Sequence, residues 1–187
     1  MPIILASASP RRRELLSLIT PEFQVVTSEV DESAVHAATP SGLALALACA
    51  KCGEVARTHF SDTGIGCDTV VEVGGKVFGK PRDKADARRM LQAYSGRSHL
   101  VHTGVCICKA GLCERFSATT KVTFCPMTKA EIEAYISTDE PYDKAGAYGI
   151  QGGAARFVRA IEGCYFNVMG LPVSRVYAAL KSLGVRL

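Results

Sequence analysis

The sequence has no long apolar run: no stretch of its 187 residues approaches the roughly 18 uninterrupted apolar residues of a membrane-spanning helix. It also has little excess charge of one sign, with a formal net charge of +4. Nucleic-acid-binding proteins concentrate much more positive charge on one face. We therefore expect neither a membrane nor a nucleic acid as partner, and a small anionic ligand is favoured over a duplex.

Repeats, low-complexity stretches and clear linkers are also absent. Apolar residues make up 48% of the chain and charged residues 21%, a balance typical of a globular protein with a sizeable core. We predict a single domain over residues 1–187. The first apolar segment is too short, and too soon followed by arginines, to be a signal peptide, which predicts a cytoplasmic protein in a reducing compartment.

The eight cysteines lack the spacing of a zinc module. Cys49 and Cys52 form a C-x-x-C, but a zinc site would need a second pair with turn signals around it. Cys106, Cys108 and Cys113 cluster loosely, and the first two fall on one face of an expected strand. We predict that all eight are small thiols in the core or on the surface. A thiol or zinc module built on the C-x-x-C is the alternative.

The first residues predict a strand, a tight loop and a helix. Ser9 suits the N-cap position of this helix, and Pro10 suits its first position. Three arginines, residues 11–13, then lie in the first turn, where each cation costs roughly 0.3–1 kcal/mol because the helix N-terminus is already positive. A polyphosphate would relieve this repulsion by accepting hydrogen bonds from the free amides and the guanidinium groups. We therefore expect an anion site here, with a solvated arginine cluster as the alternative.

The rest of the chain alternates between strand and helix patterns. Strands are expected at 23–27, 65–73, 76–78, 100–108, 112–124 and 157–161, with Gly-Gly and Ala-Gly turns at 74–75 and 110–111. Helices are expected at 43–57 after a Thr39-Pro40 start, 84–94 after an Asp83 cap, 128–136 with a Thr128/Glu131 capping box, and 172–183. The helix at 43–57 is nearly all apolar, which predicts that it is largely buried.

Isolated charges form a second group of candidates. Asp68 falls within an expected strand, where an unpaired buried carboxylate is costly, so it needs a metal, a lysine or a hydroxyl as partner. Lys51, on the apolar helix, either reaches water or points into a cleft. Lys80 lies between a glycine and a proline and is a candidate phosphate contact. Asp31 and Glu32, past a strand end, suit either a solvated loop or metal chemistry.

A glycine-rich segment at 140–153 completes the set. Its glycines let the backbone approach a ligand closely, and Tyr142, Tyr148 and Ile150 are too apolar for a flexible linker. Cations and carboxylates together suggest a metal-bound phosphate ester, and the glycine-rich segment suits a base or sugar. These residues together predict nucleotide hydrolysis.

Five motifs resemble those of the Maf family of nucleoside triphosphate pyrophosphatases, in order and nearly end to end. They are S-A-S-P-R-R at 7–12, V-D-E at 30–32, C-D-T-V-V at 67–71, G-K-P at 79–81 and Y-D-K-A-G-A-Y-G-I-Q-G at 142–152. The resemblance implies an α/β fold similar to that of the inosine triphosphate pyrophosphatases: an elongated mixed β-sheet flanked by helices, in two lobes with a central cleft. It also implies cleavage between the α and β phosphates. The last motif resembles the branch that acts on dTTP and UTP.

The resemblance implies that Asp68 is the proton acceptor and links Arg11, Thr69 and Gln151 to specificity. A glutamine amide donates and accepts, and so matches the O4 and N3–H edge of thymine or uracil. We predict that Asp68 and Glu32 hold Mg²⁺, with Mn²⁺ as an alternative. The substrate-binding residues are expected to be Ser7, Ser9, Arg11, Arg12, Lys51, Thr69, Lys80 and Gln151, whereas Arg13 faces solvent. The resemblance further implies a homodimer, and a non-catalytic nucleotide-binding regulator of cell division is the alternative function.

Overall fold

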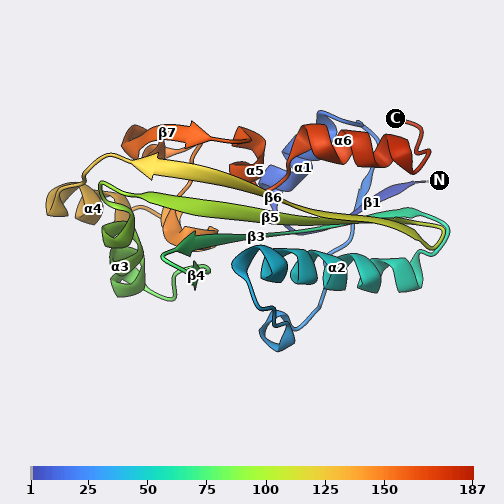
Figure 1. Ribbon diagram of the computed structural model, residues 1–187, viewed down its shortest axis with the longest axis horizontal. Helices are drawn as coiled ribbons and strands as arrows, with labels where there is room; N and C mark the ends of the chain where they lie inside the picture. Colours follow the sequence, from blue (N-terminus) through green and yellow to red (C-terminus); the bar gives the residue numbers. More distant parts are fainter. Residues whose placement is uncertain (1) are drawn as a thin grey trace.

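The computed structural model describes residues 2–187 as a long mixed β-sheet with helices on both faces (Figure 1). The seven strands run in the order β2-β1-β3-β5-β6-β7, with β4 paired to β3. They are β1 (Ile3–Ala6), β2 (Gln24–Val25), β3 (Thr63–Val73), β4 (Lys76–Phe78), β5 (Ser98–Lys109), β6 (Leu112–Phe124) and β7 (Val158–Glu162). β1 is parallel to β2 and β3, and the other pairs are antiparallel, so the expected mixed α/β class is confirmed.

Six α-helices surround the sheet in the described part of the chain. They are α1 (Pro10–Ser17), α2 (Pro40–Thr58), α3 (Lys84–Tyr94), α4 (Lys129–Ile136), α5 (Tyr165–Met169) and α6 (Val173–Ser182). Four 3₁₀ turns lie in the connections, the first between β2 and α2 and the other three between α4 and β7: η1 (Glu32–Ala34), η2 (Glu140–Asp143), η3 (Ala145–Ala147) and η4 (Gly153–Phe157). Figure 1 shows α2 along one face of the sheet, α1, α5 and α6 on the other, and α3 and α4 at one end. None of these helices is long and apolar enough to cross a membrane.

Local sequence signals set most of these boundaries. The Thr39 side chain accepts a hydrogen bond from the Gly42 N–H at the start of α2, and Asp83 caps α3 in the same way. Both bonds of the predicted capping box between Thr128 and Glu131 are present at α4. Apart from the edge strand expected at 23–27, the predicted strands, hairpins and helices are found to within a few residues, because each rests on turn or cap chemistry that acts locally.

Some predictions about local structure hold only in part. The strand expected at 23–27 contains only Gln24 and Val25, both exposed at the sheet edge, where only β1 pairs with it. Ser9 occupies the N-cap of α1, but its side chain makes no capping hydrogen bond. Five residues of α2 are fully buried and only Arg57 and Thr58 are exposed, so the helix is largely buried as predicted, with its other residues half-buried. Helix α5 was not predicted, because its N-cap, Cys164, makes no side-chain bond and gives no sequence signal.

The prediction that all eight cysteines are thiols was also wrong, because Cys108 and Cys113 form a disulfide. The Ala110-Gly111 turn, with φ of 48° and 85°, sets the register of the β5–β6 hairpin. In that register the two cysteines lie directly opposite each other, with 4.2 Å between their Cα atoms. Side chains directly opposite on antiparallel strands share one face, which brings the two sulfurs together.

Two glycines let α2 pack directly onto the strands. A Cβ atom at Gly66 of β3 would lie 2.2 Å from the carbonyl oxygen of Ala48, and one at Gly104 of β5 would lie 2.2 Å from that of Ala44. No other residue fits at either position without moving the helix backbone. The close contact fixes the height of α2 above β3 and thereby places Lys51 beside the strand.

An aromatic cluster anchors the glycine-rich segment to the far end of the sheet. His99 of β5 pairs through Nε2 with the Tyr148 hydroxyl at 2.7 Å, and the rings of Tyr94 and Phe124 pack against both. Burial lowers the pKa of His99 to about 4, so the imidazole is neutral at physiological pH. Tyr148 is thereby held rigidly, and the segment that follows it starts from a fixed point.

Candidate active site

One cavity of about 1050 Å³ brings together every residue predicted to act in catalysis or binding. Its walls come from the β1–α1 loop, η1, α2, β3, the β4–α3 loop and the glycine-rich segment. The predicted residues that line it are Ser7, Ser9, Arg11, Arg12, Glu32, Lys51, Asp68, Thr69, Lys80 and Gln151. Arg13 does not line it and is exposed, which agrees with its expected orientation.

A lysine joins the two carboxylates of the site. The Lys51 Nζ atom lies 2.6 Å from Asp68 Oδ1 and 2.7 Å from Glu32 Oε1. The Lys51 side chain is only 12% exposed, so it points into the cavity rather than to bulk water. Asp68 is 8% exposed and therefore has the lysine partner that its burial requires. This ion pair is one of the three alternatives that the sequence left open.

The same carboxylates have the chemistry of a hard-cation site. Carboxylate oxygens are the ligands that Mg²⁺ and Mn²⁺ accept in proteins. Since Asp68 and Glu32 both contact one ammonium group, they lie close enough to share one small cation. The donor set therefore fits a divalent metal.

Arg12 is tied to three different parts of the chain. Its Nε donates to the Gly170 carbonyl at 2.9 Å, Nη1 to the Ser7 hydroxyl at 3.1 Å and Nη2 to the Thr69 hydroxyl at 3.0 Å. Thr69 in turn bonds to Thr103, which donates to the Asn167 carbonyl. A guanidinium has five N–H donors, so two remain for a ligand. Arg12 thus joins α1 to the β1–α1 loop, to β3 and to the C-cap of α5, and it also faces the cavity.

Arg11 has a carboxylate partner that was not predicted from the sequence. Its Nη1 lies 3.1 Å from Asp143 Oδ2, and Lys144 Nζ lies 2.5 Å from the other oxygen of Asp143. Although partial burial acts to raise the pKa of Asp143, the hydrogen bonds from Lys144 and Arg11 hold it below its ordinary value. Asp143 therefore supplies part of the negative charge that the first turn of α1 requires.

Glu140 organises the glycine-rich segment. Its carboxylate accepts hydrogen bonds from the Tyr135 hydroxyl at 2.9 Å and from the backbone N–H of Gly153 at 2.7 Å. A Cβ atom at Gly152 would lie 2.5 Å from the same carboxylate, so only glycine allows the backbone this close. Three residues that line the cavity were not predicted as site residues from the sequence: Glu140, Asp143 and Lys144. The sequence signal that could have identified them is their position: all three are charged residues at the start of the glycine-rich segment.

We expect Glu140→Ala to lower the free energy of unfolding by about 1.5–3 kcal/mol, because a tyrosine hydroxyl and backbone N–H groups lose their charged acceptor. Asp139→Ala is the matched control, since Asp139 is exposed and its side chain does not cap η2. Urea denaturation of both variants measures the difference. Equal destabilisation by the two substitutions would show that the Glu140 carboxylate does not hold the segment.

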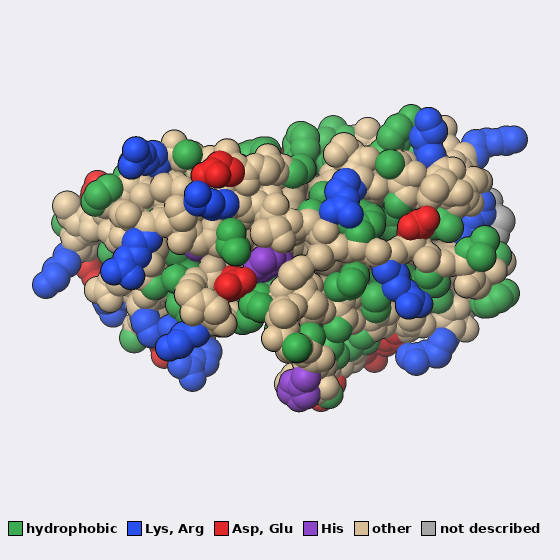
Figure 2. All heavy atoms as spheres, in the orientation of Figure 1, with side chains coloured by type: hydrophobic (Ala, Val, Ile, Leu, Met, Phe, Trp, Pro, Cys, Tyr) green, Lys and Arg blue, Asp and Glu red, His purple; other side chains and the backbone are tan. Residues whose placement is uncertain are grey.

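The other predicted binding residues differ in how strongly they are held. Ser7 is buried and accepts hydrogen bonds from Arg12 and from the Ser9 backbone N–H. Lys80 and Gln151 are exposed at the cavity, and within residues 2–187 neither side chain has a hydrogen-bond partner. Both are therefore available to a ligand. On the face shown in Figure 2, lysine and arginine side chains are scattered rather than gathered into one patch.

The fold is that of the Ham1 proteins. The Ham1 protein of Staphylococcus aureus superposes with a TM-score of 0.59 at 14% identity, covering 98% of this chain and 100% of that chain. A HAM1 protein from Coxiella burnetii gives 0.56 at 12% identity, covering 97% and 99%. At these identities the likeness concerns the fold alone.

The sequence comparisons show which family this chain belongs to. The family model of Maf-like proteins matches residues 2–183, and the chain therefore belongs to the Maf family. A protein of Carboxydothermus hydrogenoformans named dTTP/UTP pyrophosphatase is 50% identical over 98% of this chain and 100% of its own length. A protein of Bacillus cytotoxicus with the same name is 47% identical, over 95% of this chain and 93% of its own.

Proposed function

We propose that this chain is a nucleoside triphosphate pyrophosphatase that hydrolyses dTTP and UTP to the monophosphate and pyrophosphate. The observation that carries the proposal is the cavity, in which the cations Arg11, Arg12, Lys51 and Lys80 surround a carboxylate pair beside a glycine-rich segment. Relatives named dTTP/UTP pyrophosphatase, at 44%, 47% and 50% identity, support the same reaction. Their names support catalysis rather than the regulator alternative.

Asp68 is the proposed general base. Its carboxylate is buried in the cavity wall and kept beside Lys51, so it is positioned to orient a water molecule and accept its proton. The attacking oxygen then forms a bond to the α phosphorus while the bond to the α–β bridging oxygen breaks. Arg11, Arg12, Lys51 and Lys80 offset the charge that develops on the departing pyrophosphate.

We further propose that Asp68 and Glu32 hold Mg²⁺, with Mn²⁺ as a substitute. When bound, the ion would neutralise phosphate charge and polarise a phosphoryl oxygen. Lys51, which contacts both carboxylates, keeps them close together. The single domain, the cytoplasmic location and the homodimer remain predictions. Sedimentation velocity of the full chain tests whether it forms a homodimer.

Gln151 is proposed to recognise the base of the nucleotide through hydrogen bonds. It is exposed at the cavity, close in the chain to Tyr148, which the aromatic cluster holds in place. Its amide both donates and accepts, as the O4 and N3–H edge of thymine or uracil requires. The glycines on either side of Ile150 and Gln151 leave room for a base to approach the backbone.

We expect pyrophosphate release from dTTP and UTP in the presence of Mg²⁺, and slower release from purine triphosphates. The experiment incubates the full chain with each common triphosphate and measures pyrophosphate and the monophosphate. Inorganic phosphate as the product would indicate a different cleavage site. A nucleotide that binds in calorimetry yet survives unchanged would favour the regulator instead.

A further inference from the structure

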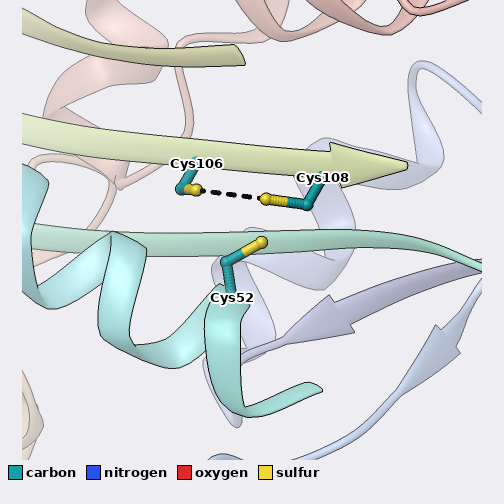
Figure 3. Close-up of side chains that lie close together, drawn as sticks. All are labelled: Cys52, Cys106 and Cys108. Carbon is teal, nitrogen blue, oxygen red and sulfur yellow. Dashed lines mark hydrogen bonds between the residues drawn. The ribbon is translucent and has the colours of Figure 1, made fainter. Parts of the chain in front are cut away.

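Five of the eight cysteines gather between α2 and the β5–β6 hairpin. The sulfur atoms of Cys52, Cys106 and Cys108 all lie within 4.8 Å of one another, and those of Cys106 and Cys108 are 3.7 Å apart (Figure 3). Cys49 packs against this group, and Cys113 is bonded to Cys108. A cavity of about 210 Å³ is lined by four of these cysteines and shares no lining residue with the candidate active site.

Two glycines of β3 explain how the sulfur of Cys52, on α2, comes close to the sulfurs of Cys106 and Cys108, on β5. Gly66 is the register partner of Cys106, and Gly64 is that of Cys108. Paired residues share a face of the sheet, so neither cysteine meets a side chain from β3. A Cβ atom at Gly66 would lie 2.8 Å from the Cβ of Cys52, and one at Gly64 would lie 3.7 Å from its sulfur. Cys52 therefore fills the space that the glycines leave.

The helix contributes two sulfurs because its cysteines are three residues apart. Residues at positions i and i+3 share a helix face, so Cys49 and Cys52 approach the sheet together. Cys106 and Cys108, two apart on a strand, likewise share one face. Three of these four sulfurs, those of Cys52, Cys106 and Cys108, lie within 4.8 Å of one another, and Cys49 packs against the group. Figure 3 shows that Cys52 extends from α2 towards the two strand cysteines.

Thiolates at this spacing suit a thiophilic metal ion. Two sulfurs bound to one tetrahedral Zn²⁺, each at about 2.3 Å, are about 3.8 Å apart. With Cys108 still bonded to Cys113, its sulfur lies 3.7 Å from that of Cys106, which is close to that distance. Arg115 is the register partner of Cys106 on β6 and lines the small cavity, so its charge offsets part of the negative charge of coordinating thiolates. Mg²⁺ prefers oxygen ligands and does not compete here.

We propose that the reduced chain binds one Zn²⁺ ion through Cys52, Cys106 and Cys108, with Cys49 as the fourth ligand. The Cys108–Cys113 disulfide removes one ligand from this set. A dithiol reductant supplies two electrons and two protons to the disulfide, which becomes two thiols while the reductant becomes a cyclic disulfide. Each coordinating thiol then releases its proton as the sulfur binds the ion.

The test is an anaerobic titration of the full chain with Zn²⁺, after reduction with dithiothreitol and removal of the reductant. Excess Mg²⁺ is present to occupy carboxylate sites. Calorimetry is expected to show one Zn²⁺ per chain, and Cd²⁺ in its place is expected to give sulfur-to-cadmium charge-transfer absorbance. Cys52→Ser and Cys106→Ser should each weaken binding about tenfold or more, and the oxidised chain should bind correspondingly more weakly. Cys125→Ser, a free cysteine outside the cluster, is the matched control.

Absence of stoichiometric binding by the reduced wild-type chain would overturn the proposal. Binding that survives both Cys52→Ser and Cys106→Ser unchanged would also overturn it. Equal affinities of the oxidised and reduced chains would remove Cys108 from the ligand set. Should the serine variants fail to fold, the cadmium absorbance of the wild-type chain decides, because it reports sulfur ligands without any substitution.

Discussion

Replacing Asp68 by asparagine is expected to lower kcat for dTTP by about 10²–10⁴-fold, the usual contribution of a positioned general base. Asparagine has the same shape and keeps an oxygen that can accept the hydrogen bond from Lys51, which lies 2.6 Å from Asp68 Oδ1. It cannot take a proton from water at neutral pH. Because Glu32 still pairs with Lys51, the ammonium keeps a partner and the fold is expected to survive.

Glu72→Gln is the matched control for this substitution. Glu72 lies on the same strand as Asp68 and also has a basic partner, with its Oε2 2.8 Å from His102 Nε2, but it does not line the active-site cavity. Pyrophosphate release and thermal unfolding are measured for both variants with Mg²⁺ in excess. Wild-type turnover by Asp68→Asn would make the aspartate a structural partner of Lys51 and nothing more.

Most of the fold was predictable because its signals are local. The Thr128/Glu131 box, the Asp83 cap and the Gly74-Gly75 turn each act within a few residues, and each is found where predicted. Ser9 is the exception: its backbone has the N-cap geometry, but the Ser7 hydroxyl accepts a hydrogen bond from the Ser9 N–H. The identity of a capping residue therefore does not fix what its side chain does.

The pairings of the site were not predictable, because they depend on register and distant contacts. Arg11 and Asp143 are 132 residues apart in the sequence, and only the folded chain brings them within 3.1 Å. Cys52 meets Cys106 only because Gly66 on β3 leaves space between α2 and β5. Sequence motifs identified which residues line the cavity, whereas which charges neutralise one another depends on the tertiary structure.

Arg12→Ala is expected to reduce both activity and stability. Loss of the charged hydrogen bonds to Gly170, Ser7 and Thr69 should lower the free energy of unfolding by about 2–3 kcal/mol. Loss of a cation from the cavity should lower kcat/KM for dTTP by about 10- to 100-fold, since each 1.36 kcal/mol of lost transition-state binding is tenfold in rate. Kinetics at a temperature well below the melting transition separate the two effects.

Arg13→Ala is the matched control, because the neighbouring guanidinium is exposed and outside the cavity. Its free energy of unfolding should stay within about 0.5 kcal/mol of the wild-type value, as for most surface substitutions. Removing any one of three equivalent solvated arginines would have the same small effect. Similar kinetics for the two alanine variants would therefore favour the solvated cluster. A selective loss in Arg12→Ala would instead identify the strand–loop–helix start as the place where the triphosphate binds.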